Sequence, residues 1–357
     1  MAEILNAHGS KNDIFVTPLT PADFAPEADL RAFVRNLCDR DGPFGGDGIY
    51  FYDARRPVPE AWFFNPDGSA AEFCGNGMRC LGRVILDLRG TETAQIRSGQ
   101  RDYTVRRGPT TAEGVRQVML EHPAVDFDQP VVAGRRSAAE ASLPELDPAL
   151  LFTAVTVPNP HLVTVIDKYV ESDLVAMGER VAARRDRFPA GANLSVLLPL
   201  APAEVFVRTY ERGAGLTASC GSGMAASRAV YSRIGRCDPE RDVVIRNAGG
   251  MATVSLRVRD GQWFPVLSGN ATFVYRADVD PALLARGDGT APGGRPPSAP
   301  PILGGNLSPQ TPSAPPILGG PIPPLADREP YPDEIRAYSA LDQQNSERLR
   351  AAGIETA

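Results

Sequence analysis

Asn65-Pro-Asp-Gly-Ser-Ala-Ala-Glu-Phe-Cys-Gly-Asn-Gly-Met-Arg-Cys80 is the stretch on which the interpretation of this sequence depends. In it, Cys74 stands where a glycine-punctuated turn passes into a helix-compatible run from Met78 to Leu86. A cysteine at a helix start lies beside unpaired backbone N–H groups and the positive end of the helix dipole, which lower a thiol pKa. We therefore predict thiolate character at Cys74.

The same arrangement recurs later in the chain. Residues 211–224 read Glu-Arg-Gly-Ala-Gly-Leu-Thr-Ala-Ser-Cys-Gly-Ser-Gly-Met and precede another good helix former, residues 225–231. Cys74 and Cys220 thus each precede Gly-X-Gly-Met and a helix. Two such thiols are interpreted more simply as facing partners than as unrelated residues.

Length and charge restrict the class of protein. A chain of 357 residues favours a two-domain body with appendages, and 43% hydrophobic residues favour a globular one. The net charge of −6 provides no general basic surface for nucleic acid or an anionic membrane. We expect a small-molecule partner.

Targeting and metal signals are weak. The start, Met1-Ala2-Glu3-Ile4, has no charged leader before an apolar run, so we expect a soluble cytoplasmic protein. Five cysteines at irregular spacing do not resemble a secreted disulfide framework, and with three histidines they lack the pattern of a structural zinc site. We expect no metal and no cofactor. The cysteines are Cys38, Cys74, Cys80, Cys220 and Cys237, and the histidines are His8, His122 and His161.

Many short alternating segments surround a few helical ones, which predicts α+β organisation and not a parallel Rossmann sheet. Residues 126–136 are interpreted as a crossing segment between two halves of similar order. The helices predicted from periodicity cover residues 27–37, 78–86, 175–184 and 225–231.

Beyond about Asp278 the composition changes. Pro, Gly, Ser and Ala dominate residues 288–325, and Pro-Ser-Ala-Pro-Pro-Ile-Leu-Gly-Gly occurs at 297–305 and again at 312–320. Such a segment cannot bury enough apolar surface to offset its ordering entropy, so we predict a disordered or polyproline linker, followed by a short helix over 333–352. The repeat is interpreted as a duplication in a tolerant tail, in preference to a partner-docking motif.

Two opposed cysteines, one thiolate and one thiol, can remove a proton from one face of a carbon acid and return one to the other face. The stereocentre is then inverted without a cofactor. The glycine-rich turns after each thiol allow backbone N–H groups to approach the substrate carboxylate. For an isolated Cys-Gly pair a small buried hydrophobe is the simpler interpretation, but the doubled motif favours catalysis. The chain has no nucleophile elbow, Walker loop or dinucleotide fingerprint that would indicate other chemistry.

The motif Asn-Pro-Asp-Gly-Ser-x-x-x-x-Cys-Gly-Asn-Gly-x-Arg at 65–79 resembles the signature of diaminopimelate epimerase, and Glu-Arg-Gly through Cys-Gly-Ser-Gly at 211–223 resembles that family's second cysteine motif. The resemblance covers residues 4–275. It implies two pseudo-equivalent domains, each a β-barrel-like, antiparallel-rich sheet around a central helix, with the active site between them. The expected domains are 1–124, completed by strand 267–276, then 125–266, then the tail 279–357.

The resemblance also implies an activity, the two-base epimerisation of LL- to meso-diaminopimelate in lysine and peptidoglycan precursor biosynthesis. Cys74 and Cys220 would be the acid/base pair, assisted by His161 and Glu211. A structural hydrogen-bonding role for His161 is left open, as is a homodimer. The implied substrate contacts are Asn12, Asn65, Asn159, Asn193, Glu211, Arg212 and the amides of Gly75, Asn76, Gly221 and Ser222.

Several positions depart from the family pattern: Lys11, Pro158, Leu216 and Asn270. Leu216 matters most, because it replaces a glutamate close to Cys220. The alternative is a racemase or epimerase of the same fold acting on another amino acid, although the asparagines and Arg212 favour a substrate with a distal amino-carboxylate. A non-catalytic amino-acid-binding protein or a thiol-redox protein is a further alternative. The presence of both cysteines argues against a pure binder.

Overall fold

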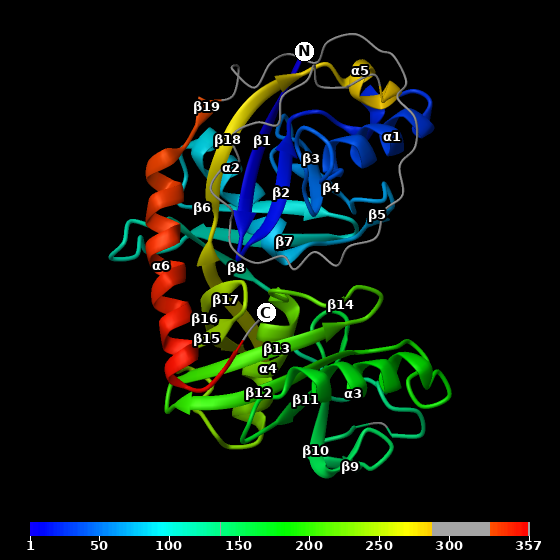
Figure 1. Ribbon diagram of the computed structural model, residues 1–357, viewed down its shortest axis with the longest axis vertical. Coiled ribbons are helices and arrows are strands. Elements are labelled where there is room, and N and C mark those ends of the chain that lie inside the picture. The colour runs from blue at the N-terminus through cyan, green and yellow to red at the C-terminus, as the bar shows by residue number, and fades with distance from the viewer. Residues whose placement is uncertain (136, 288–328, 356–357) are drawn as a thin grey trace. The chain divides into compact units, whose positions relative to one another are not determined.

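The computed structural model describes residues 1–135, 137–287 and 329–355 (Figure 1). The chain divides into two compact units. Unit 1 comprises Met1–Val118 and Ala271–Ser339, and unit 2 comprises Met119–Asn270 and Ala340–Thr356. Each unit is a mixed sheet with few helices, and this confirms the α+β prediction.

The sheet of unit 1 is mainly antiparallel. β1 forms a hairpin with β2 and pairs antiparallel with β18, a late strand of the chain (Figure 1). β2 pairs parallel with β3, β3 antiparallel with β4, β4 parallel with β6, and β6 antiparallel with β7. The strands are β1 Ala2–Gly9, β2 Asn12–Thr17, β3 Gly48–Asp53, β4 Glu60–Phe64, β5 Ala70–Ala71, β6 Thr93–Ser98, β7 Arg101–Arg107 and β18 Thr272–Val279.

Helix α2 (Gly75–Arg89) lies against strands β1, β2, β3, β6 and β7 of unit 1. Its apolar residues are buried, and at Gly82 an added Cβ would come within 2.9 Å of Val105 Cγ1. The helix can therefore sit close to the sheet only because this position has no side chain. It ends at Gly90, which adopts the left-handed conformation common after helices.

The hairpin turn between β1 and β2 shows which residue type the backbone favours at position 11. Ser10 and Lys11 both have positive φ, 56° and 61°. Two consecutive left-handed residues are typical of a tight hairpin turn, and glycine adopts that conformation without strain. Lys11 thus occupies a position at which the backbone favours glycine.

Unit 2 repeats this organisation. Its strands pair in the order β9, β10, β11, β12, β13, β15, β16, β17, with parallel pairs at β11–β12 and β13–β15. The strands are β9 Ala141–Leu143, β10 Asp147–Thr156, β11 Pro160–Val165, β12 Asn193–Ala201, β13 Glu204–Glu211, β14 Gly215–Leu216, β15 Val243–Asn247, β16 Gly250–Arg259 and β17 Gln262–Asn270. β8 (Gln117–Glu121) contains the boundary between the two units.

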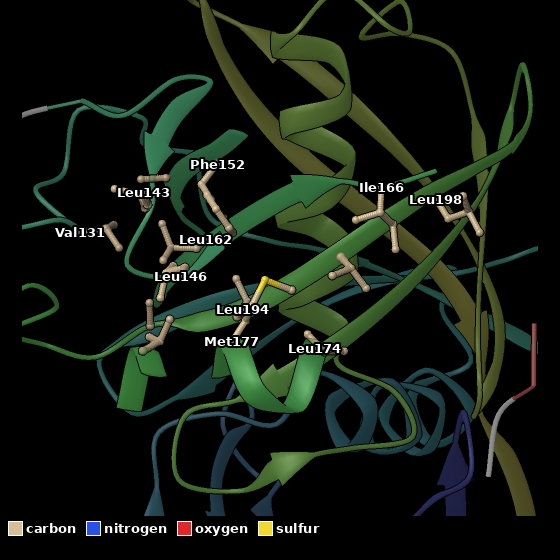
Figure 2. Packing of buried hydrophobic residues seen from close by; sticks show 14 of the residues in the cluster. Val131, Leu143, Leu146, Phe152, Leu162, Ile166, Leu174, Met177, Leu194 and Leu198 are labelled. Atoms are coloured by element: carbon tan, nitrogen blue, oxygen red, sulfur yellow. The ribbon is translucent and has the colours of Figure 1, made fainter. Parts of the chain in front are cut away.

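Helices α3 and α4 of unit 2 pack in two different hydrophobic clusters. α3 (Glu171–Ala183) places Leu174 and Met177 against strand residues such as Leu194 and Leu162 (Figure 2). α4 (Gly221–Arg233) is buried along almost its whole length and packs in a second cluster. The surrounding strands thus hold α4 in place, and with it Cys220, which directly precedes the first turn of the helix.

The helix predicted over 333–352 is present, and the C-terminal region also makes contacts that the sequence did not predict. α5 (Pro281–Arg286) packs against α1 (Glu27–Cys38), and β19 (Glu329–Pro330) pairs with β18. α6 (Pro332–Ala351), shown in orange and red in Figure 1, contributes buried residues to both units. Spaced residues such as Tyr338, Leu341 and Leu349 make one face of α6 apolar, which the weak periodicity of the sequence understated. The predicted linker 288–325, with its repeats, lies outside the described residues.

No helix among the described residues is long and apolar enough to cross a membrane. In the same residues no group of three or more His, Cys, Asp or Glu side chains is arranged to hold a metal ion. All five cysteines are free thiols.

Candidate active site

Cys74 caps helix α2 in unit 1. The thiol Sγ accepts a hydrogen bond from the backbone N–H of Gly77 at 3.4 Å, so the cysteine takes the place of the usual hydroxyl or carboxylate cap. Tyr50 of β3 holds this turn, because its hydroxyl accepts from the Cys74 N–H at 3.0 Å and lies 3.3 Å from the Cys74 carbonyl oxygen. Gly75 and Asn76 begin the helix, where backbone N–H groups lack helical partners.

Cys220 caps helix α4 in unit 2 in the same way. Its Sγ accepts from the Gly223 N–H at 3.3 Å, and the Ser222 hydroxyl lies 3.5 Å from the sulfur. Gly221 and Ser222 begin the helix. An added Cβ at Gly223 would come within 2.4 Å of Thr209 Oγ1, so glycine is required for this close approach. The doubled sequence motif therefore corresponds to a doubled structure.

Cys220 lies beside a carboxylate. Burial and then the charge of Glu211 raise the pKa of the Cys220 thiol well above its usual value, although the Ser222 and Gly223 hydrogen bonds oppose this. Burial raises the pKa of Glu211, opposed by hydrogen bonds from Thr217 and Cys220. The Thr217 hydroxyl donates to Glu211 Oε1 at 2.5 Å. In the free protein, burial raises the pKa of Cys220 by more than the start of helix α4 lowers it. Cys220 is therefore protonated.

The remaining predicted residues of unit 1 fall into two places. Asn12, at the start of β2, lies next to the first thiol, with Cys74 Sγ 3.6 Å from Asn12 Oδ1. Asn76 is buried, and its Oδ1 accepts from the buried Arg79 at 3.1 Å. Asn65 lies in a turn, where its Nδ2 donates to Ser69 Oγ at 3.0 Å. The Asn65 side chain thus stabilises this turn independently of any ligand.

The remaining predicted residues of unit 2 gather at the ends of adjacent strands. His161 and Asn193 are register partners in the parallel pair β11–β12, so their side chains share one face of the sheet. Asn193 Oδ1 accepts from the Arg212 backbone N–H at 2.8 Å, and His161 Nε2 lies 3.1 Å from Asn159 Oδ1. Within the described part of the chain, His161 Nδ1 and Asn193 Nδ2 are buried without a hydrogen-bond partner. Buried polar atoms without partners are costly, so they mark a surface prepared for a ligand.

His161 is a neutral imidazole at physiological pH. Burial, followed by the nearby His122 and Arg212, lowers the pKa of His161 to about 3. A neutral ring that donates Nε2–H to Asn159 has an unprotonated Nδ1. His161 can therefore accept a hydrogen bond or a proton, but it carries no spare proton to donate.

Leu216 faces the hydrophobic core of unit 2. It lies in β14, pairs with Tyr210, and packs with it against the buried cluster of Figure 2. The carboxylate beside Cys220 is supplied by Glu211 and oriented by Thr217. The substitution thus leaves a negative charge next to this thiol.

Sequence reasoning did not find Tyr50 or Thr217. A tyrosine in an apolar strand such as Ile49-Tyr50-Phe51 reads as a core residue, and its two contacts with Cys74 depend on the fold. Thr217 stands inside the second motif three residues before Cys220, which is the only signal that could have indicated it.

Comparison with known proteins identifies a family. The family model described as "Diaminopimelate epimerase" matches residues 153–274. The protein named diaminopimelate epimerase from Ligilactobacillus salivarius is 33% identical over 311 residues, covering 80% of this chain and 92% of that one. The one from Clostridium acetobutylicum is 31% identical, covering 78% and 85%.

The chain belongs to the diaminopimelate epimerase family.

Solved structures support the fold of this family at much lower sequence identity. A phenazine biosynthesis protein of the PhzF family from Bacillus anthracis matches with a TM-score of 0.56 and 14% identity, covering 78% of this chain and 99% of that one. A probable proline racemase from Agrobacterium radiobacter matches with a TM-score of 0.55 and 13% identity, covering 80% and 96%. These similarities concern the fold alone.

Proposed function

We propose that this protein interconverts LL- and meso-diaminopimelate without a cofactor, and that it acts in the formation of lysine and peptidoglycan precursors. The observation that carries the proposal is that each unit has a helix capped by a cysteine thiol. Family membership supports diaminopimelate as the substrate.

In the proposed reaction Cys74 and Cys220 act on opposite faces of the same carbon. One cysteine, as thiolate, removes the α-proton, and the other, as thiol, delivers a proton to the opposite face. Negative charge moves into the substrate carboxylate at the transition state. The N–H groups of Gly75, Asn76, Gly221 and Ser222 at the two helix starts would stabilise it.

The polar residues of unit 2 are suited to the substrate's other polar groups. His161 Nδ1 and Asn193 Nδ2, which lack partners in the described residues, provide one acceptor and one donor. Arg212 adds a positive charge nearby: its backbone N–H donates to Asn193 Oδ1, its guanidinium donates to the Ala190 carbonyl oxygen, and its charge contributes to the lowered pKa of His161. An acceptor, a donor and a cation fit an amino-carboxylate group.

Incubation of the purified protein with LL-diaminopimelate, followed by chiral separation of the product, tests the proposal. We expect conversion to a mixture of the LL and meso forms, and no conversion of proline, hydroxyproline or glutamate. Inversion of one of those amino acids, with diaminopimelate unchanged, would transfer the protein to a different racemase activity.

A further inference from the structure

The glycine-rich turn at 42–48 leads to Asp47, which contacts the residue next to the first thiol. Asp47 Oδ2 accepts from Asn12 Nδ2 at 3.1 Å and from the Asp13 backbone N–H at 2.9 Å. The Asp47 backbone N–H donates to the Asp13 carbonyl at 2.7 Å. Arg40 Nη2 binds the other carboxylate oxygen of Asp47 at 2.6 Å. The carboxylate is therefore fixed from several sides.

These contacts determine which way the Asn12 amide faces. A carboxylate can only accept hydrogen bonds, so the NH2 group of Asn12 must point to Asp47. The amide oxygen then points to Cys74, whose Sγ is 3.6 Å away. An amide oxygen also can only accept, so this contact requires a proton on the sulfur.

The turn itself allows little movement of Asp47. An added Cβ at Gly46 would come within 2.6 Å of Phe15 Cε2, and at Gly48, where φ is +150°, within 2.6 Å of Phe63 Cζ. The two glycines that flank Asp47 thus pack directly on aromatic rings of the sheet. Gly46 and Gly48 are therefore needed for close packing against the sheet as well as for the chain reversal.

We propose that Asp47 is a positioning residue that holds the Asn12 amide oxygen toward Cys74 and so favours the protonated form of this thiol in the free protein. The inference rests on the proposed function in treating Cys74 as one of the two acid/base groups. Asp47 itself acts only through Asn12. Arg40 fixes the far side of the carboxylate.

Asp47→Ala tests this by removing the carboxylate. An amide in its place could still accept from Asn12 Nδ2 and the Asp13 N–H through its oxygen, whereas alanine offers neither of them an acceptor. The Asn12 amide can then turn over and direct its NH2 group to the sulfur, which favours the thiolate. Because the thiolate is the form that reacts, we expect iodoacetamide to alkylate Cys74 at least about threefold faster relative to Cys220 at neutral pH. Mass spectrometry of both cysteine peptides from one sample gives this ratio.

Asp41→Ala is the matched control, since Asp41 is an exposed carboxylate directly before the same turn. Its Cys74 to Cys220 alkylation ratio should equal that of the unmodified protein. In an Asn12→Leu background, Asp47→Ala should leave the ratio unchanged, because the residue that transmits the effect is absent. A wild-type ratio in Asp47→Ala, or an equal change in both backgrounds, would overturn the inference.

Asn12→Leu alone keeps the inference testable if Asp47→Ala does not fold, as circular dichroism would reveal. It removes the acceptor without changing Asp47, so the ratio should again rise, and an unchanged ratio would contradict the role of Asn12. The alkylation ratio needs no substrate. Failure to epimerise diaminopimelate with the expected ratios would count against the proposed function alone.

Discussion

At the scale of single residues, the Glu211 carboxylate influences the protonation of the Cys220 thiol, one of the two proposed acid/base groups. The carboxylate raises the pKa of the thiol, after the larger effect of burial. Glu211→Gln should therefore lower the Cys220 pKa and speed its alkylation at neutral pH, while reducing turnover. Mass spectrometry across a pH series measures the first effect. Glu240→Gln, at an exposed position of the same unit, should change neither quantity, and an unchanged Cys220 profile in Glu211→Gln would refute the coupling.

His161 should make the stability of the protein depend on pH. Its pKa is lowered from 6.5 to about 3, so the unfolded chain binds a proton that the folded one excludes. The stability from this group is complete above pH 6.5 and is lost as the pH falls toward 3. Urea unfolding at several pH values should therefore show a steeper acid loss for the natural protein than for His161→Gln. Parallel curves would mean that His161 is accessible to protons in the folded state.

The residues that sequence could identify are those whose chemistry is visible in a motif. Cys74 and Cys220 stand out because the motif is doubled, and the structure gives both thiols the same cap geometry. Tyr50 could not be identified, since its role depends on where β3 passes α2. A helix start does not by itself set the pKa of a thiol, because burial raises the pKa of Cys220. The thiolate character of Cys74 stays a prediction.

At the scale of elements, the start of α2 depends on Tyr50. Its hydroxyl contacts both the N–H and the carbonyl of Cys74. Tyr50→Phe removes both contacts and leaves the buried Cys74 backbone less well satisfied, so we expect a loss of about 1–2 kcal/mol in the free energy of unfolding. Turnover should fall by about tenfold or more, because small displacements of a catalytic group are costly. Tyr52→Phe in the same strand is the control. Equal turnover in the two variants would argue against a role for Tyr50 in placing the thiol.

The elements were predicted best where periodicity was strong. The helix expected at 27–37 is α1, Glu27–Cys38, with a clear apolar face. α3 was expected from residue 175 but begins at Glu171, because its first turn is polar and carries acidic residues instead of core contacts. α5 was missed altogether. A helix of six residues has too few positions to show a period.

At the scale of the whole molecule, the C-terminal region is part of the folded body. Glu334 of α6 binds the buried Arg83 through both carboxylate oxygens, at 2.5 and 2.6 Å, and accepts from the Phe273 N–H at 3.0 Å. Arg83 also lies over the Phe273 ring, 3.7 Å from its centroid. Glu334→Ala should leave the buried cation with only the longer Asp87 ion pair, at 3.7 Å, and the Ala271 carbonyl oxygen, and cost about 3 kcal/mol in the free energy of unfolding.

Glu347→Ala is the control for this prediction, since Glu347 lies on the same helix and its partner, Gln343, makes an exposed contact. It should change the free energy of unfolding by less than about 0.5 kcal/mol. Chemical denaturation measures both variants. Equal stabilities would mean that α6 is a dispensable appendage of unit 1.

The sequence predicted the α+β class because short strands and few helices are visible in its alternation. It could not predict that α6 docks on the body. The residues that bury α6 contact partners far away in the chain, such as Asn345 with Asn247 in unit 2 and Tyr338 with His8 in unit 1.

The central claim is that one cysteine removes the α-proton from one face of diaminopimelate and the other cysteine delivers a different proton to the opposite face. The most direct test is the deuterium content of product and recovered substrate after brief reaction of LL-diaminopimelate in deuterated water, measured by mass spectrometry. We predict that the meso product carries one solvent deuterium at the inverted carbon while recovered LL-diaminopimelate carries none, because the proton removed and the proton delivered belong to different cysteines. Product that retains the original hydrogen would show that one base serves both faces and would contradict the account.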